Sequence, residues 1–105
     1  MLTDKVYEKL KLVPAGKVTT YKLLAEACGV KAYRAVGQIL KRNPYAPSVP
    51  CHRVIKSDGN IGGFMGKTRG KEVEKKIMML KKEGIIIEGE KAKNLTDILF
   101  SFKTV

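Results

Sequence analysis

The stretch TYKLLAEACGVKAYRAVGQILKR, residues 20–42, decides the fold. Apolar residues recur in it at helical spacing and predict two short helices, over about residues 21–28 and 31–42. Thr20 can cap the first helix with its hydroxyl, and Gly29 can end it. Two short helices joined by a tight turn that contains glycine are typical of a helix-turn-helix. The stretch therefore predicts a helix-turn-helix, and for the chain as a whole we expect a mainly α-helical, winged helix-turn-helix-like DNA-binding domain with short strands.

The second predicted helix has two chemically different faces. Its inner face is apolar and carries Tyr33, Val36, Ile39 and Leu40. Its outer face is basic and carries Arg34, Gln38, Lys41 and Arg42. Gly37 lies on the same outer face, although glycine inside a helix costs about 1 kcal/mol relative to alanine. Close approach of a DNA backbone is one explanation, and close packing of a neighbouring protein segment is the other.

Further elements flank this motif. Apolar spacing predicts a helix over residues 4–12, a fourth helix over about 69–83, and a last helix that Asn94 caps. The last helix would carry on one face Leu95, Ile98, Leu99 and Phe102. Ile85-Ile86-Ile87 predicts a short strand. Residues 45–66 form an irregular segment, and a long loop of this kind in a small domain is usually functional.

The length and the net charge of the chain limit the class of protein to which it can belong. The chain has 105 residues, so we expect one domain over residues 1–105. Its 21 basic and 10 acidic residues give a net charge of +11, which favours a nucleic-acid partner over a lysine-rich surface that only aids solubility. No stretch approaches the roughly 20 apolar residues of a membrane span, and the N-terminus lacks the pattern of a signal peptide. We therefore expect a cytoplasmic monomer with no membrane contact.

Cysteine and histidine are few. Cys28 and Cys51 are too few for a disulfide scaffold, and no pair has zinc-ligand spacing, so we expect no metal site. Cys28 lies on the inner face of its helix and is interpreted as a core residue. Cys51 stands beside His52, the only histidine of the chain. The simple interpretation is a buried thiol beside a surface histidine. The other is a reactive thiol, which Pro50, Arg53 and the glycine-rich loop that follows favour.

A reactive Cys51 would need two further groups in the right places. In an extended segment neighbouring side chains point to opposite faces, so Cys51 and His52 could meet only across a bend or through a water. A third group, most naturally a carboxylate, should hold the imidazole in its working tautomer. Ten acidic residues are candidates, and spacing alone does not choose between them.

Pro50-Cys51-His52-Arg53-Val54 resembles the active-site signature of the O6-alkylguanine-DNA alkyltransferases, the methylated-DNA–protein-cysteine methyltransferases. The resemblance extends from about Val6 to Gly84, with every motif in family order. The motifs look like the start of the helix-turn-helix, the recognition helix, the asparagine hinge, the substrate-binding loop and the end of the following helix. In that order they are Val18-Thr19-Thr20-Tyr21, Ala32-Tyr33-Arg34-Ala35-Val36-Gly37, Arg42-Asn43-Pro44, Asp58-Gly59 through Gly62-Gly63-Phe64, and Lys82-Glu83-Gly84.

The resemblance implies a DNA-repair reaction that needs no cofactor. The recognition helix would enter the minor groove of double-stranded DNA, and Arg34 would intercalate to fill the space left by a flipped O6-alkylguanine. Cys51 would attack the alkyl carbon and keep the group as a thioether. Nothing regenerates the thiol, so each molecule would act once, as a methylated-DNA–[protein]-cysteine S-methyltransferase.

The resemblance also implies a role for each site residue. His52 would act through a water as the base, Glu83 would orient it, and Asn43 would brace the turn before the active-site segment. Tyr21 would donate a proton or a hydrogen bond to guanine N3. Contacts to the base would come from the segments that contain Val54, Gly63, Phe64 and Met65. Contacts to DNA would come from Thr20, Arg34, Gly37, Gln38, Lys41 and Arg42.

The sequence departs from the family pattern in three ways. The sequence resembles only the C-terminal active domain of the family, so we expect the usual N-terminal domain to be absent. Met65 stands where many members have a small hydroxyl residue near O6, and a thioether cannot donate a hydrogen bond. The short form also resembles the alkyltransferase-like proteins, which bind alkylguanine without repairing it and often have tryptophan in place of the cysteine. Cys51 is retained and the chain has no tryptophan, which favours repair.

Three other hypotheses remain. A damage sensor of the alkyltransferase-like kind would flip and hold the base, then recruit other repair factors. A winged helix-turn-helix regulator with Cys51 as a redox sensor would bind a specific sequence in the major groove, but it does not explain Asn43, Gly62-Gly63 and Glu83 together. A cysteine hydrolase would lack a second histidine or another partner that activates water.

Overall fold

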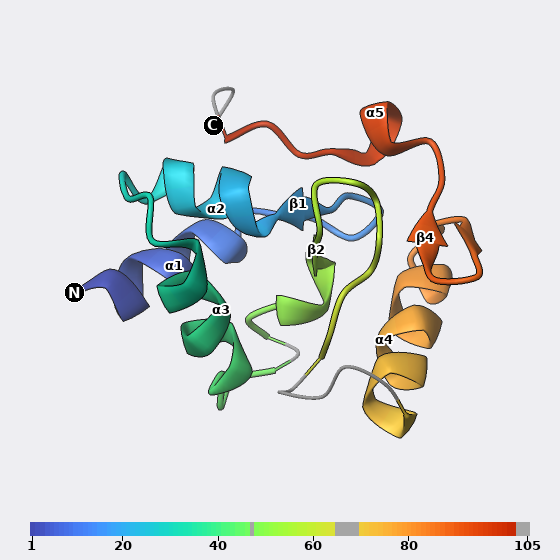
Figure 1. Ribbon diagram of the computed structural model, residues 1–105, viewed down its shortest axis with the longest axis horizontal. Helices are drawn as coiled ribbons and strands as arrows, with labels where there is room; N and C mark the ends of the chain where they lie inside the picture. Colours follow the sequence, from blue (N-terminus) through green and yellow to red (C-terminus); the bar gives the residue numbers. More distant parts are fainter. Residues whose placement is uncertain (47, 65–69, 103–105) are drawn as a thin grey trace.

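The computed structural model describes residues 1–46, 48–64 and 70–102. This part of the chain is mainly helical with short strands, as the sequence predicts. In chain order the elements are α1 (Leu2–Leu10), β1 (Thr19–Thr20), α2 (Tyr21–Ala27), α3 (Tyr33–Lys41), the 3-10 turn η1 (Cys51–Arg53), β2 (Val54–Ile55), α4 (Lys71–Lys82), β3 (Ile87–Glu88), β4 (Lys91–Ala92) and α5 (Leu95–Ile98). In Figure 1, α1, α2 and α3 lie on one side, α4 lies on the other, and η1 and β2 lie between them.

Local signals set the two ends of α2. The Thr20 hydroxyl accepts a hydrogen bond from the backbone N–H of Leu23 at 3.1 Å and so caps the helix, as predicted. Gly29, just beyond its end, has a φ of 77°, a conformation that favours glycine. The chain turns there and enters α3, which packs against α2. Together they form the expected helix-turn-helix.

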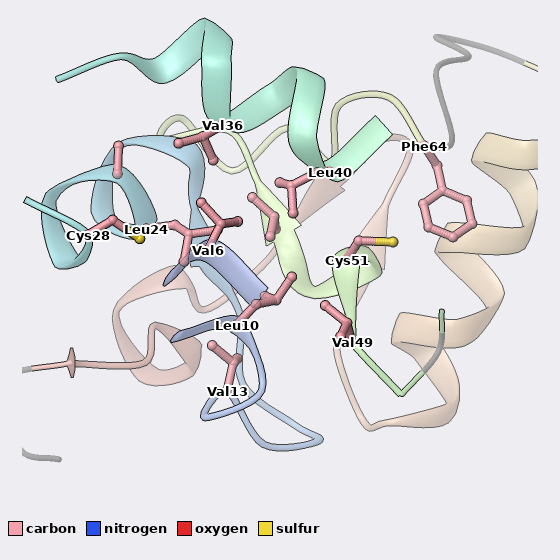
Figure 2. Packing of buried hydrophobic residues seen from close by; sticks show 12 residues of the cluster. Val6, Leu10, Val13, Leu24, Cys28, Val36, Leu40, Val49, Cys51 and Phe64 are labelled. Atoms are coloured by element: carbon pink, nitrogen blue, oxygen red, sulfur yellow. The ribbon is translucent and has the colours of Figure 1, made fainter. Parts of the chain in front are cut away.

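The three N-terminal helices share one hydrophobic core (Figure 2). From these helices it contains Val6, Leu10, Leu24, Val36 and Leu40. Cys28 is buried in the same cluster, which confirms it as a core residue. Val49 and Cys51 also belong to it. The segment that carries Cys51 is therefore packed directly onto the helix-turn-helix.

A second core lies against α4. β1 and β2 pair in parallel, with Thr19 opposite Val54 and Thr20 opposite Ile55. β3 and β4 pair as an antiparallel hairpin, which is the wing. The second core combines residues of β2, α4 and the wing, among them Ile55, Val73, Leu80, Ile87 and Ala92. Because α4 also contacts η1, the turn that carries Cys51 is held between the two cores.

The first helix and the strand of isoleucines have bounds in the structure that differ from the predicted ones. The first helix runs from Leu2 to Leu10 rather than over residues 4–12. Of the three consecutive isoleucines only Ile87 lies in a strand, because Gly84, with a φ of 90°, turns the chain after α4 before β3 begins. Tyr33, expected on the inner face of α3, is the first residue of that helix and is 42% exposed.

The C-terminal helix is shorter than predicted. α5 ends at Ile98, so Phe102 does not share a helical face with it, and Asn94 makes no capping hydrogen bond through its side chain. The backbone at Ile98 and Phe100 instead forms hydrogen bonds with Val18. The N–H of Val18 donates to the carbonyl of Ile98, and the N–H of Phe100 donates to the carbonyl of Val18, both at 2.8 Å. This pairing keeps the chain after Ile98 extended.

Candidate functional site

Cys51 lies in a tight turn rather than in an extended segment. The N–H of Arg53 donates to the carbonyl of Pro50 at 2.9 Å and closes the turn η1. Cys51 is 6% exposed, and in Figure 2 its sulfur points to the side on which the ring of Phe64 lies. Within the described residues, Cys51 and His52 make no direct hydrogen bond. Contact between them through a water remains the arrangement that the sequence predicts.

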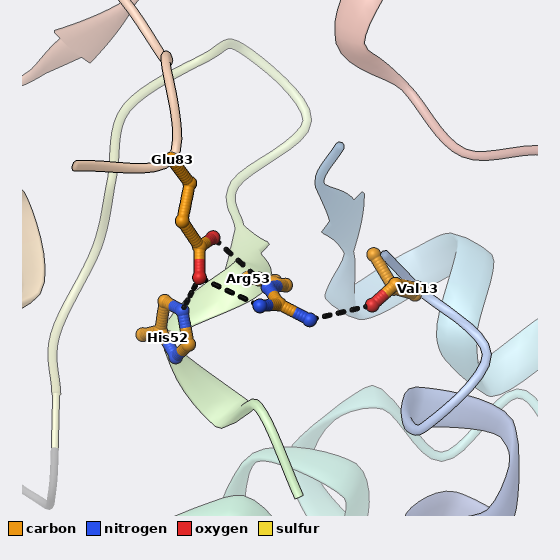
Figure 3. A network of polar contacts seen from close by, with 4 residues as sticks. All are labelled: Val13, His52, Arg53 and Glu83. Atoms are coloured by element: carbon orange, nitrogen blue, oxygen red, sulfur yellow. Dashed lines mark hydrogen bonds and ion pairs between the residues drawn. The ribbon is translucent and has the colours of Figure 1, made fainter. Parts of the chain in front are cut away.

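His52 and Arg53 both bind one carboxylate, that of Glu83 (Figure 3). His52 Nε2 lies 2.9 Å from Glu83 Oε2. Arg53 donates to the same carboxylate through Nε and Nη2, at 2.9 and 2.6 Å, and through Nη1 to the carbonyl of Val13 at 2.8 Å. The structure thus selects one carboxylate among the ten acidic residues, and it is the one that the family resemblance assigns.

These contacts set the protonation states of Glu83 and His52. Burial raises the pKa of Glu83, but hydrogen bonds from Arg53 and His52 outweigh it and leave the pKa below its usual value. Burial lowers the pKa of His52, although Glu83 acts in the opposite direction. Glu83 is therefore ionised and His52 is neutral at pH 7. A carboxylate can only accept, so Nε2 carries the imidazole proton and Nδ1 is left as the basic nitrogen.

Asn43 lies between α3 and the Cys51 turn and is buried. Its Nδ2 donates to the carbonyl of Val49 at 2.9 Å, and its Oδ1 accepts from the N–H of Tyr45 at 2.9 Å. The side chain therefore joins both ends of the segment that leads to Cys51. This is the position that a bracing residue needs.

Tyr21, the first residue of α2, reaches the loop of residues 60–64. Gly62 has a φ of 70°, and a Cβ placed on it would lie 3.7 Å from the Tyr21 hydroxyl. Burial raises the pKa of Tyr21, and its electrostatic interaction with Cys51 raises it further. Tyr21 therefore keeps its proton at neutral pH and can serve as a donor near the thiol.

Three of the four residues expected around the base are described by the structure. Val54 and Phe64 are buried, and Gly63 is half-buried. The carbonyls of Val54 and Gly63 each accept a hydrogen bond from Lys76 Nζ, at 2.7 and 3.0 Å. Met65 falls outside the described residues.

The outer face of α3 has the predicted form. It exposes Arg34, Gln38, Lys41 and Arg42. A Cβ placed on Gly37 would meet nothing within 4 Å, so packing of a protein segment does not explain this glycine. Thr20 does not join this face. It is 3% exposed and its hydroxyl is used as the cap of α2, so its contact with DNA stays a prediction.

Two residues of the site were missed from the sequence. The sequence indicates Arg53 only as a nearby positive charge, whereas in the structure it binds Glu83. The sequence interpretation assigns no role to Lys76, which is completely buried. A signal for Lys76 exists in the sequence, since it follows Val73 by three residues and precedes Leu80 by four. That spacing puts it on the apolar stripe of its helix.

The described residues show neither a metal site nor a membrane span. No group of three or more His, Cys, Asp or Glu side chains in them is arranged to hold a metal ion. In the same part of the chain, no helix has the length and apolar character that crossing a membrane requires.

Comparison with known proteins places these motifs in a family. Residues 1–85 match the model described as 6-O-methylguanine DNA methyltransferase, DNA binding domain. A methylated-DNA–protein-cysteine methyltransferase of Pyrobaculum aerophilum is 50% identical over 75 residues, which are 71% of this chain and 48% of that protein. Across the first relatives found, this chain spans about half of their length or less.

Solved structures agree with this match. The O6-methylguanine-DNA methyltransferase of Pyrococcus kodakaraensis strain KOD1 superposes with a TM-score of 0.67 at 46% identity, over 79% of this chain and 46% of that one. S. pombe Atl1, in complex with damaged DNA containing O6-carboxymethylguanine, superposes with a TM-score of 0.82 at 31% identity, over 95% of this chain and 94% of that one. With the Cys51 turn, its Glu83 partner and the helix-turn-helix in place, the chain belongs to the family of the 6-O-methylguanine DNA methyltransferase DNA-binding domain.

Proposed function

We propose that the protein repairs double-stranded DNA by transferring the alkyl group of O6-alkylguanine to Cys51, once per molecule. The observation that carries this proposal is the arrangement beside Cys51, where His52 Nε2 lies 2.9 Å from the ionised carboxylate of Glu83. A neutral histidine held in that way offers its other nitrogen as a base. The names of the relatives support the same reaction.

The transfer step uses groups from three parts of the fold. The proton of Cys51 passes to His52, through a water, and the thiolate attacks the alkyl carbon. A carbon–sulfur bond forms as the bond between that carbon and guanine O6 breaks, and the electron pair of the broken bond stays on the purine. A hydrogen bond or proton from the Tyr21 hydroxyl to guanine N3 compensates the developing charge. The products are a cysteine thioether and guanine, since the purine anion takes up one proton in place of the one that Cys51 lost to His52.

The substrate has to leave the base stack, since O6 is not reachable inside the duplex. The exposed face of α3 supplies positive charge for the phosphates, and Arg34 can fill the space of the flipped nucleotide. Gly37 lets the helix backbone approach DNA closely.

A damage sensor is the second candidate. The superposition with S. pombe Atl1, a protein solved with damaged DNA, runs along almost the whole of both chains and favours it. The retained Cys51 and its Glu83-bound histidine argue for repair, because a protein that only holds the base has no use for an activated thiol.

Mass spectrometry of the intact protein distinguishes the repair protein from the damage sensor. Incubation with a duplex that carries one O6-methylguanine is expected to add one methyl group, and peptide mapping is expected to find it on Cys51 and not on Cys28. Cys51→Ala is the control that should gain nothing. No gain by the wild-type protein, with tighter binding to the lesion than to plain DNA, would support the sensor. No gain and no lesion preference would refute both.

A further inference from the structure

Tyr33 is an exposed aromatic residue to which the proposed reaction assigns no role. It is the first residue of α3 and directly precedes Arg34. Its side chain is 42% exposed, whereas Val36 and Leu40 of the same helix are buried in the core (Figure 2). A tyrosine combines an apolar ring with a polar tip and is enriched where proteins contact other molecules. Tyr33 thus offers apolar area to whatever contacts this end of α3.

Tyr33 shares a stripe of the helix surface with Gly37. Residues four apart in an α-helix lie on one face, about 6 Å apart along the axis. Lys41 continues this stripe and is exposed, and the neighbouring stripe carries the exposed Arg34 and Gln38. The opposite side of α3 packs against α1 and α2. Tyr33 therefore belongs to the outer face of α3, the face that the proposed function brings onto DNA.

The ring of Tyr33 stands higher on this face than its neighbour Gly37. A Cβ added to Gly37 would meet nothing within 4 Å, so the helix backbone is bare at that point. Side chains of a helix lean toward its N-terminus, so the ring covers the first turn and not the bare backbone. A duplex that contacts the backbone at Gly37 therefore also meets a large ring one helical turn away, and it has to accommodate that ring.

A duplex accommodates such a ring by opening a base step. Apolar side chains inserted between base pairs partly unstack them and kink the duplex. An aromatic ring also stacks on a base of any type, so it can hold an opened step without reading the sequence. Arg34 projects roughly 100° further round the helix than Tyr33, so the two side chains lie side by side and need not occupy the same space.

We propose that Tyr33 is a positioning residue for base flipping, whose ring stacks on the base pair next to the flipped O6-alkylguanine. This inference rests on the proposed function, which places the outer face of α3 on DNA and Arg34 in the space of the flipped nucleotide. Tyr33 does not contact the alkylated base and acts by holding the neighbouring base step open. The ring carries this role, and the hydroxyl does not, because stacking needs only the π face.

Tyr33→Ala tests this role, Tyr33→Phe keeps the ring, and Tyr45→Ala is the matched control. Tyr45 is 59% exposed and packs edge-to-face against Tyr7, so the control also removes one exposed tyrosine. Single-turnover rates are measured with a saturating duplex that carries one O6-methylguanine, and separately with free O6-benzylguanine. Relative to the control, Tyr33→Ala is expected to react about tenfold more slowly with the duplex and equally fast with the free base. Tyr33→Phe is expected to react like the wild type with both.

A fluorescent base beside the lesion reports on the base step directly, which a merely structural residue would not affect. The duplex carries 2-aminopurine next to the O6-methylguanine, and its fluorescence is recorded with and without saturating protein. The wild type, Tyr33→Phe and Tyr45→Ala are expected to change the signal, and Tyr33→Ala is expected to lose most of this change. Thermal unfolding checks the variants, and no loss of stability is expected because alanine is a better helix former than tyrosine.

A folded Tyr33→Ala protein with the control's duplex rate, or with the control's 2-aminopurine signal, would overturn the proposal. Equal slowing with the duplex and with the free base would overturn it as well, since the effect would then lie in the Cys51 pocket. If the wild-type protein takes no methyl group from DNA, the proposed function fails. The 2-aminopurine signal then still decides the role of Tyr33, and a wild-type protein that leaves this signal unchanged would refute that role.

Discussion

Replacement of Gly37 by alanine is expected to raise the stability of the protein and to lower its DNA affinity. Gly37 is the middle residue of α3, which runs from Tyr33 to Lys41, and an added Cβ would meet nothing within 4 Å. The methyl group therefore fits the free protein without strain. Alanine is better than glycine inside a helix by about 1 kcal/mol. A gain of that size raises the midpoint of thermal unfolding by roughly 4–8 °C in a domain of this size.

The same methyl group points away from the protein, on the face that carries Arg34 and Gln38. If the backbone of α3 touches DNA there, an extra carbon must push the two surfaces apart. Overpacking by one such group costs about 1–3 kcal/mol in a close-packed interior. A tenfold loss of affinity corresponds to about 1.4 kcal/mol, so a loss of about tenfold is expected for alanine and a larger one for leucine.

The assay combines thermal unfolding with fluorescence-anisotropy titration of a lesion-bearing duplex at one fixed salt concentration. Reaction of Cys51 with free O6-benzylguanine is the internal control, and Gly37→Ala should leave it unchanged because the change is outside the pocket. Alanine and leucine variants that bind the duplex as tightly as the wild type would refute close approach of DNA to Gly37. A loss of stability in Gly37→Ala would refute the description of this position as open.

Four further outcomes are expected. Cys51→Ala should abolish methyl transfer but keep binding to the alkylated duplex in an anisotropy titration; equal loss of both would contradict the division of roles. Arg34→Ala should slow reaction with the lesion in duplex DNA at least tenfold while reaction with the free alkylated base stays unchanged, and equal slowing would remove Arg34 from an intercalating role. Asn43→Ala leaves one buried carbonyl, that of Val49, and one partly buried N–H, that of Tyr45, without their partner, and should lower the free energy of unfolding by about 2 kcal/mol, measured by urea titration. Stability should fall as the pH drops below about 6.5, because unfolded His52 takes up a proton at its usual pKa while burial lowers the pKa of His52 in the folded protein. Glu83 acts in the same direction, since its folded pKa is also lowered and its contribution is lost as the pH falls. Unfolding midpoints that stay constant between about pH 5 and 7 would contradict this.

The helix-turn-helix was predictable because its signals are local. The Thr20 cap, the left-handed Gly29 and the apolar spacing of α2 and α3 each act within one or two helical turns. The exposed basic face of α3 follows from the same spacing. The C-terminal segment was mispredicted because its course depends on backbone pairing with Val18, about 80 residues earlier in the chain.

The site was only partly predictable, for a related reason. Cys51 and His52 are neighbours in sequence, so the Cys-His motif could be recognised, but the tight turn that holds it could not. The choice of Glu83 among the acidic residues came from the family resemblance. Contacts that cross 30 residues of chain, such as that of Arg53 with Glu83, have no local signature. The three acceptors of Lys76 are backbone carbonyls, which sequence does not distinguish.

The Arg53–Glu83 pair shows why fold and chemistry are not separable at this site. Glu83 directly follows α4, and the end of a helix carries a partial negative charge that disfavours a carboxylate. Burial disfavours the ionised form as well. The two hydrogen bonds from Arg53 offset both effects and keep Glu83 able to orient His52. The remaining hydrogen bond of Arg53, to the Val13 carbonyl, anchors the same group to the chain after α1. Replacing Arg53 therefore removes the link between Glu83 and the chain after α1, and it also weakens the hold of Glu83 on His52. For this reason the rate of alkyl transfer by an Arg53 variant has to be compared with its unfolding midpoint.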